Sequence, residues 1–166
     1  MNIFDFAINF EKDSEEYYLE LARKCENQGL KKILLMLADD EKKHQEIVIK
    51  MKSNVSNIEF LETKILLNVK NIFQEMKDKN QNLDDVNIKQ KNLYRHAEEL
   101  EKKSEEFYLE KAKVAENEEH KKIFLMLAEE EKKHFFLLYN IQQFVSHPDY
   151  WVENAEFHHL DAYEEY

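Results

Sequence analysis

A long internal repeat constrains the fold of this chain more than any other feature of its sequence. Residues 11–44 recur ninety positions later as residues 101–134, and 22 of the 34 aligned positions are identical. Each copy begins with a glutamate and ends with Glu-x-x-His. Two such halves pack with approximate twofold symmetry, so a site begun by one half is completed by the other. The repeat therefore supplies four carboxylates and two imidazoles, a set suited to holding two metal ions.

Apolar residues recur every three or four positions around these motifs, which predicts four long helices that each turn one face to a shared core. The polar residues of the motifs fall within these apolar stripes, so we expect them to point inward. They are Glu11, Glu41, His44, Glu101, Glu131 and His134.

Buried ionised carboxylates are costly unless a cation accompanies them, and four in one core also repel one another. No Lys or Arg occupies a stripe position. Two divalent cations would balance the charge, and a Glu and a His three residues apart lie on one helical face. One Glu from each of two helices plus Glu-x-x-His from the other two is the ligand pattern of di-iron and di-manganese bundles. We therefore predict that all six residues bind metal.

Tyr18 and Tyr108 each follow the first glutamate of their half by seven residues. Two compatible interpretations apply to them. They are ordinary core residues whose hydroxyls find a partner, or they position ligating carboxylates through hydrogen bonds. The rival for the whole pattern is a duplicated structural hairpin without metal, but such a hairpin would not need glutamates at its buried positions.

Composition favours one all-α domain and disfavours several kinds of partner. With one Gly and one Pro in 166 residues, the chain has little material for turns. Its formal charge of −11 argues against nucleic acid and anionic membranes. It has no apolar run long enough to span a membrane and no basic leader at its start, so we expect a cytoplasmic protein. Cys25 is the only cysteine, which excludes an internal disulfide or a four-cysteine iron centre within these residues.

We predict a bundle over residues 1–146, with repeat halves 1–52 and 86–146, a crossover over 53–85 and a helical extension over 147–166. The first helix is expected to end at Asn27-Gln28-Gly29, where the glycine would adopt a left-handed conformation. The second is expected to end near Lys52, and the last near Ser146.

The crossover carries a helical pattern of its own from Leu61 to Met76 and is long enough to run the length of the bundle. Asp84 or Asp85 is the expected cap of the next helix. The C-terminal extension is expected to pack on the bundle or on a partner chain. The alternative for that segment is a second metal site using Glu156, His158 or His159.

With these motifs, the chain resembles the rubrerythrin group of ferritin-like proteins over nearly its whole length. Classical ferritins lack the second His of the pair, whereas bacterioferritin shares both motifs. The resemblance implies a ferritin-like four-helix bundle with a di-iron centre. In that centre Glu41 and Glu131 would bridge the irons, and the terminal ligands would be Glu11, His44, Glu101 and His134.

The resemblance also implies reduction of hydrogen peroxide in the defence of anaerobic or microaerophilic cells. Typical members receive electrons from a four-cysteine rubredoxin domain, so turnover here would need an external electron-transfer protein. Typical members also have an extra glutamate one turn after the third-helix ligand, where this chain has Ser104. Glu98, one turn before Glu101, is a candidate for a seventh metal ligand.

Two rival functions use the same ligands. Iron storage with ferroxidase activity toward dioxygen would require a large closed shell of subunits, whereas the peroxidase interpretation goes with a homodimer or another small homo-oligomer. A di-manganese catalase would need no electron donor, and Glu and His ligands suit manganese as well as iron.

Overall fold

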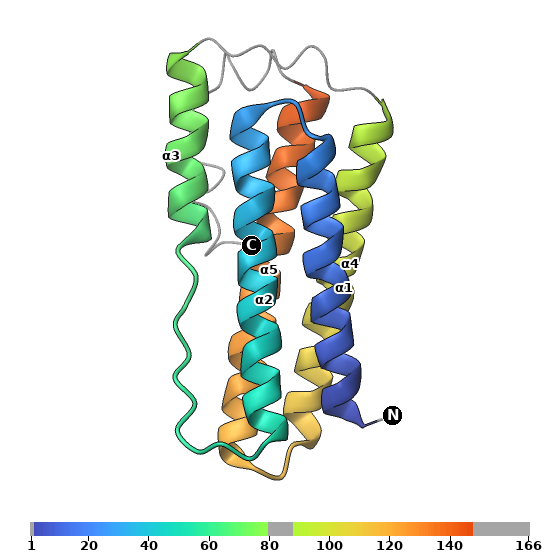
Figure 1. Ribbon diagram of the computed structural model, residues 1–166, viewed down its shortest axis with the longest axis vertical. Helices are drawn as coiled ribbons and strands as arrows, with labels where there is room; N and C mark the ends of the chain where they lie inside the picture. Colours follow the sequence, from blue (N-terminus) through green and yellow to red (C-terminus); the bar gives the residue numbers. More distant parts are fainter. Residues whose placement is uncertain (1, 80–87, 148–166) are drawn as a thin grey trace.

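The computed structural model describes residues 2–79 and 88–147, and within these residues it contains five helices and no strand. Two antiparallel helical hairpins form the bundle, and a crossover with a shorter helix joins them (Figure 1). This confirms the predicted all-α, ferritin-like bundle. The helices are α1 (Ile3–Lys24), α2 (Gln28–Lys52), α3 (Ile65–Asp78), α4 (Ile88–Val114) and α5 (Glu118–Ser146).

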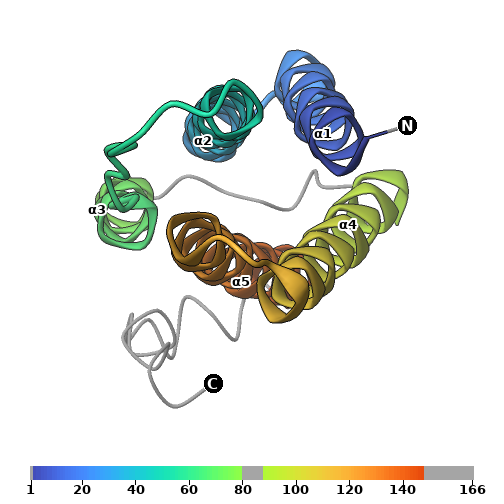
Figure 2. The ribbon, with the colours of Figure 1, turned by 90° about the horizontal axis from the view of Figure 1, so that it is seen from below.

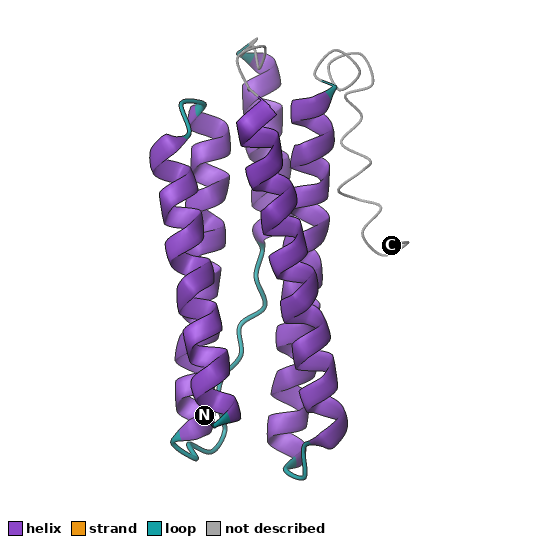
Figure 3. Cartoon of the chain, turned by 90° about the vertical axis from the view of Figure 1, so that its right-hand side faces the viewer, coloured by secondary structure: helices purple, strands orange, loops and turns teal. Residues whose placement is uncertain are grey.

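Viewed along the bundle, α1 faces α4 and α2 faces α5 (Figure 2). The hydroxyl of Tyr17 on α1 donates to the backbone carbonyl of Leu93 on α4 at 2.9 Å, which ties the two hairpins together. The two hairpins stand side by side, with the extended part of the crossover visible between them (Figure 3). The crossover therefore covers only the side of the bundle formed by α2 and α5.

The crossover confirms the predicted helix but shifts its start. The buried face of α3 consists of Ile65, Val69, Phe73 and Met76, all within the predicted pattern. Leu61 is not part of this helix and is 77% exposed. Residues 61–63 instead belong to the extended part of the crossover (Figure 1), in which Thr63 bonds to the bundle through its side chain and its backbone.

Both hairpin turns are short, and both use an asparagine at the same position of the repeat. Asn27 caps α2 by accepting a hydrogen bond from the backbone N–H of Leu30 at 3.0 Å. Asn117 caps α5 by accepting from His120 at the same distance. Asparagine is a preferred N-cap because its side chain satisfies a backbone donor that the helix leaves free.

The hydrophobic core is divided into two clusters. One lies at the end where α2 begins and includes Leu34, Phe73 and Leu137. The other lies at the opposite end and includes Val48 and Leu127. The six polar residues predicted to bind metal belong to neither cluster, because they form a polar layer between them.

The prediction for Gly29 was wrong. Helix α1 already ends at Lys24, and Gly29 lies in the first turn of α2 with a negative φ. Its lack of a side chain serves packing, because a Cβ atom at this position would lie 2.2 Å from Sδ of Met76 on α3. Helix α3 lies at the opposite end of the bundle from the start of α5 (Figure 1), so no side chain of α3 restricts the repeat counterpart Glu119.

Two other predicted helix ends are confirmed, and two further predictions fall on residues that the structure does not describe. Helices α2 and α5 end at Lys52 and Ser146, as predicted. The expected caps Asp84 and Asp85 and the alternative site at Glu156, His158 and His159 lie outside the described residues. None of the helices in the described part of the chain is long and apolar enough to cross a membrane.

We predict that Gly29→Ala lowers the free energy of unfolding by about 1–2 kcal/mol, because Met76 must leave its position against α2. In a Met76→Ala background, the same change should instead raise stability by about 0.5–1 kcal/mol, because alanine favours the helix over glycine. Urea unfolding of the four proteins in this cycle measures both effects. Equal effects of Gly29→Ala in the two backgrounds would contradict this account of the glycine.

Candidate metal centre

The structure brings the six predicted ligand residues together at the middle of the bundle. Helices α1 and α4 each contribute one glutamate, and α2 and α5 each contribute Glu-x-x-His. Every one of these side chains is buried, with at most 3% of its surface exposed. Their ligand atoms form two groups, each within 4.8 Å: Glu11, Glu41, His44 and Glu131, and Glu41, Glu101, Glu131 and His134.

The two groups share Glu41 and Glu131, so these two carboxylates lie between the two candidate metal positions. Glu11 and His44 belong only to one position, and Glu101 and His134 only to the other. This division has the approximate symmetry of the repeat, since each residue and its counterpart ninety positions away exchange places.

The inward atoms of these side chains lack hydrogen-bond partners. Both carboxylate oxygens of Glu131 and the Nδ1 atoms of both histidines are buried without one. The Nδ1 atoms lie 2.9 Å from Oε1 of Glu131 for His44 and 2.9 Å from Oε1 of Glu41 for His134, but without hydrogen-bond geometry. Buried polar atoms normally have partners. These converging oxygen and nitrogen atoms have no hydrogen-bond partner and are of the types that divalent cations prefer as ligands. They therefore fit a pair of metal ions.

Burial makes the carboxylates resist ionisation as long as no cation is bound. Burial and repulsion by Glu41 raise the pKa of Glu11 well above its usual value. Burial and Glu101 also raise the pKa of Glu41. Burial and Glu41 do the same for Glu131. For Glu101, burial acts in that direction too, but His134, Glu131 and Tyr18 together outweigh it and lower the pKa. The cluster thus holds protons that a metal ion has to displace.

The two histidines differ in their electrostatic surroundings. Burial and the charge on His134 lower the pKa of His44 to about 3. Burial also disfavours charge on His134, but Glu101, Asp40 and Glu41 outweigh it and raise its pKa well above the usual value. His44 is therefore neutral at physiological pH without any metal, the form in which histidine binds metal.

The two tyrosines link the halves of the repeat. The hydroxyl of Tyr18 on α1 donates to Glu101 on α4, and that of Tyr108 on α4 donates to Glu11 on α1. Burial and Glu101 raise the pKa of Tyr18 well above its usual value, and burial and Glu11 do so for Tyr108. Both hydroxyls therefore stay protonated and act as donors. Their catalytic relevance stays a prediction, but the hydrogen bonds have the form it requires.

Three residues around the cluster were not identified from the sequence. Asp40 and its repeat counterpart Glu130 are 5% and 2% exposed, and both accept hydrogen bonds from Thr63 of the crossover. Asp40 also lies 3.4 Å from Nε2 of His134. The acidic residue just before each Glu-x-x-His, present in both copies, was the available signal. Nothing in the sequence indicated Thr63, because it lies outside the repeat.

The position of Glu98 differs from that of the six residues. It is buried, with 8% of its surface exposed, but it belongs to neither group of converging ligand atoms. Its Oε1 has no hydrogen-bond partner. Burial raises its pKa to about 7. Ser104, one turn beyond Glu101, is also buried, and its hydroxyl has no partner.

Comparison with known proteins agrees with this geometry. The family model described as rubrerythrin matches residues 2–141. The chain belongs to the rubrerythrin family. A solved structure of a hypothetical protein from Pyrococcus furiosus shares the fold, with a TM-score of 0.63 and 23% identity over 86% of this chain and 87% of that chain. No curated protein matches the chain. Family membership and the buried Glu/His cluster together fit a di-metal protein of the rubrerythrin type.

We predict that Glu98→Gln stabilises the metal-free protein at about pH 8 by about 1 kcal/mol, after allowance for partial solvation. Because folding raises the pKa of Glu98, its contribution to stability is greatest below its unfolded pKa and is lost as the pH rises through about 7. The gain should therefore shrink as the pH falls toward about 4.5. Urea unfolding at several pH values tests this, with the exposed neighbour Glu99→Gln as the control. A gain independent of pH would contradict it.

We also predict that metal binding releases protons. Because three of the four carboxylates hold protons more tightly than usual, affinity for Zn²⁺ should be weaker at about pH 5.5 than at about pH 7.5. Calorimetric titration in two buffers with different ionisation enthalpies counts the protons. The Glu11→Gln variant should release fewer protons than the unaltered protein when Zn²⁺ binds. Proton-neutral binding by the unaltered protein would refute the electrostatic description of the cluster.

Proposed function

We propose that this protein is a non-haem di-iron oxidoreductase that reduces hydrogen peroxide with electrons from an external electron-transfer protein. The observation that carries the proposal is the set of six buried, converging ligand residues in a chain of the rubrerythrin family. Glu11 and His44 would hold one iron, Glu101 and His134 would hold the other, and Glu41 and Glu131 would contact both.

The chain's own residues prepare this centre in three ways. Burial between two hydrophobic clusters keeps bulk water from the ligands. Tyr18 and Tyr108 each hold one oxygen of a terminal glutamate, which orients the other oxygen inward. The neutral carboxyl form that burial favours in the metal-free chain limits repulsion among the carboxylates until a cation binds.

The chemistry that a bound ferrous pair supplies is the transfer of two electrons to hydrogen peroxide, which takes up two protons and becomes two molecules of water. The two electrons must then be restored from outside. The 166 residues contain a single cysteine, Cys25, and therefore no four-cysteine iron centre to restore them. This is why the proposal includes a separate electron-donor protein as partner.

We predict about two iron ions per chain in protein purified without oxygen, and fast oxidation of the centre when peroxide is added. Glu41→Ala and Glu131→Ala should each abolish binding of the iron pair, because each removes a carboxylate shared by both positions. The variants should remain helical, since loss of a buried charge relieves repulsion. Elemental analysis, absorbance after peroxide addition and circular dichroism measure these outcomes.

The exposed Glu46→Ala, on the same helix as Glu41, is the matched control and should keep its iron. Unchanged metal content in both ligand variants would overturn the assignment. Two manganese ions with oxygen release from peroxide would replace the proposal with a catalase. Slow reaction with peroxide and a very large native assembly would replace it with iron storage, whereas a homodimer or another small homo-oligomer agrees with the enzyme.

A further inference from the structure

In both halves of the centre, Nδ1 of the histidine faces the other ligand residues. The surroundings of the two Nε2 atoms, which face away from the ligands, differ. Asp40 and Glu130 occupy the same position of the repeat. Oδ2 of Asp40 lies 3.4 Å from Nε2 of His134, within reach of a hydrogen bond. Symmetry would place Glu130 against Nε2 of His44, yet between these two described residues there is no hydrogen bond or ion pair. Nε2 of His134 therefore has a carboxylate partner, whereas Nε2 of His44 has none among the described residues.

The crossover causes this difference, because it passes along one side of the bundle only. The backbone N–H of Thr63 donates to Oε2 of Glu130 at 2.9 Å, and Lys133 occupies the other carboxylate oxygen at 3.0 Å. Lys43 occupies Oδ1 of Asp40 in the same way, also at 3.0 Å, so the lysines do not distinguish the two carboxylates. The hydroxyl of Thr63 donates to the same oxygen of Asp40 that faces His134. A single residue thus binds both carboxylates, through its hydroxyl beside His134 and through its backbone N–H on the other side.

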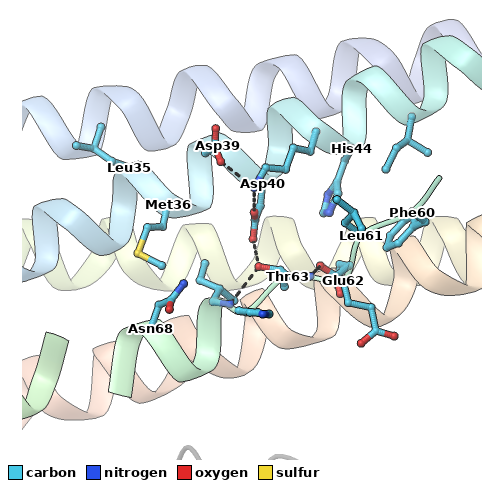
Figure 4. Close-up of a pocket in the computed structure, with 15 residues that line it drawn as sticks. Leu35, Met36, Asp39, Asp40, His44, Phe60, Leu61, Glu62, Thr63 and Asn68 are labelled. Atoms are coloured by element: carbon cyan, nitrogen blue, oxygen red, sulfur yellow. Dashed lines mark hydrogen bonds and ion pairs between the residues drawn. The ribbon is translucent and has the colours of Figure 1, made fainter. Parts of the chain in front are cut away.

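A cavity of about 530 Å³ lies beside Thr63, under the crossover. Figure 4 shows His44 and Asp40 on one wall, with Phe60, Leu61 and Thr63 of the crossover opposite. His44 lines this cavity, whereas His134 does not. His44 is 3% exposed and His134 is fully buried. The imidazole whose Nε2 has no carboxylate partner among the described residues is therefore also the one that borders the cavity.

We propose that the two metal positions are unequal, and that the position completed by His44 is the weaker and more readily exchanged of the two. Asp40 is a positioning residue for His134, because it fixes the direction of the ring and increases the basicity of the nitrogen that binds metal. His44 has no such partner, and an ion bound beside it has the cavity as its route to solvent. The inference rests on the two-metal centre of the proposed function.

Titration of the metal-free full chain with Co²⁺, followed by visible absorbance and calorimetry, tests the inference without any turnover. We expect two binding steps that differ in affinity by about 10–100-fold, the usual effect of an outer-shell partner of a ligating histidine. His44→Ala should remove the weaker step, and His134→Ala should remove the tighter one. These two variants assign each step to a position.

Asp40→Asn and Glu130→Gln form a matched pair, since each removes one negative charge at the same position of the repeat. Asp40→Asn should weaken the tighter step by about 10-fold or more, whereas Glu130→Gln should leave both steps within about threefold of the unaltered protein. Circular dichroism establishes that both variants fold. In the loaded protein, a chelator should remove the ion assigned to His44 first.

The outcomes separate this inference from the proposed function. Two Co²⁺ ions bound with equal affinity, equal effects of the two variants, or loss of the tighter step in His44→Ala would overturn the inequality and leave the di-metal centre intact. If the folded chain binds neither Co²⁺ nor iron, the di-metal centre itself is refuted, and the inequality with it.

Discussion

Four glutamate carboxylates lie at mid-height of the bundle, out of contact with water, and their burial imposes conditions on everything around them. Moving one ionised carboxylate into a protein interior costs several kcal/mol even after relaxation. The carboxylates also raise one another's pKa values, as the effect of Glu41 on Glu11 and Glu131 shows. A centre of this kind is stable only with protons or cations in it. The two hydrophobic clusters on either side supply the packing that holds the helices in place around it.

Within that constraint, the molecule combines symmetry at the centre with asymmetry around it. The hydrogen bonds from Tyr18 to Glu101 and from Tyr108 to Glu11 are exchanged by the repeat, and each crosses from one hairpin to the other. The crossover has no counterpart in the repeat, and at some of its contacts with the bundle the two halves differ. Gly29 against Glu119 at the starts of α2 and α5, and Asp40 against Glu130 beside the histidines, are the two clearest cases.

The inner part of this arrangement could be predicted from the sequence because helical periodicity and the repeat each determine it. Glu11, Glu41 and His44 interrupt apolar stripes, and their counterparts do so ninety residues later. A helical bundle was the only assumption needed to predict that these side chains converge. The helix ends at Lys52 and Ser146 were also predictable. Features that depend on the crossover were not. The role of Gly29 is determined by Met76, and that of Thr63 by two distant carboxylates, and a local sequence pattern carries no information about such contacts.

The hydrogen bonds of the tyrosines between the hairpins have a consequence for the ancestry of the chain. One hairpin alone carries two glutamates, a histidine and a tyrosine whose partner lies on another hairpin, so a single unit of this kind is complete only as a symmetric dimer. In such a dimer every substitution changes both sites at once. Joining two copies into one chain removes that coupling. In the joined chain, aspartate and glutamate stand at one repeat position with different contacts, which identical subunits of a symmetric dimer cannot have.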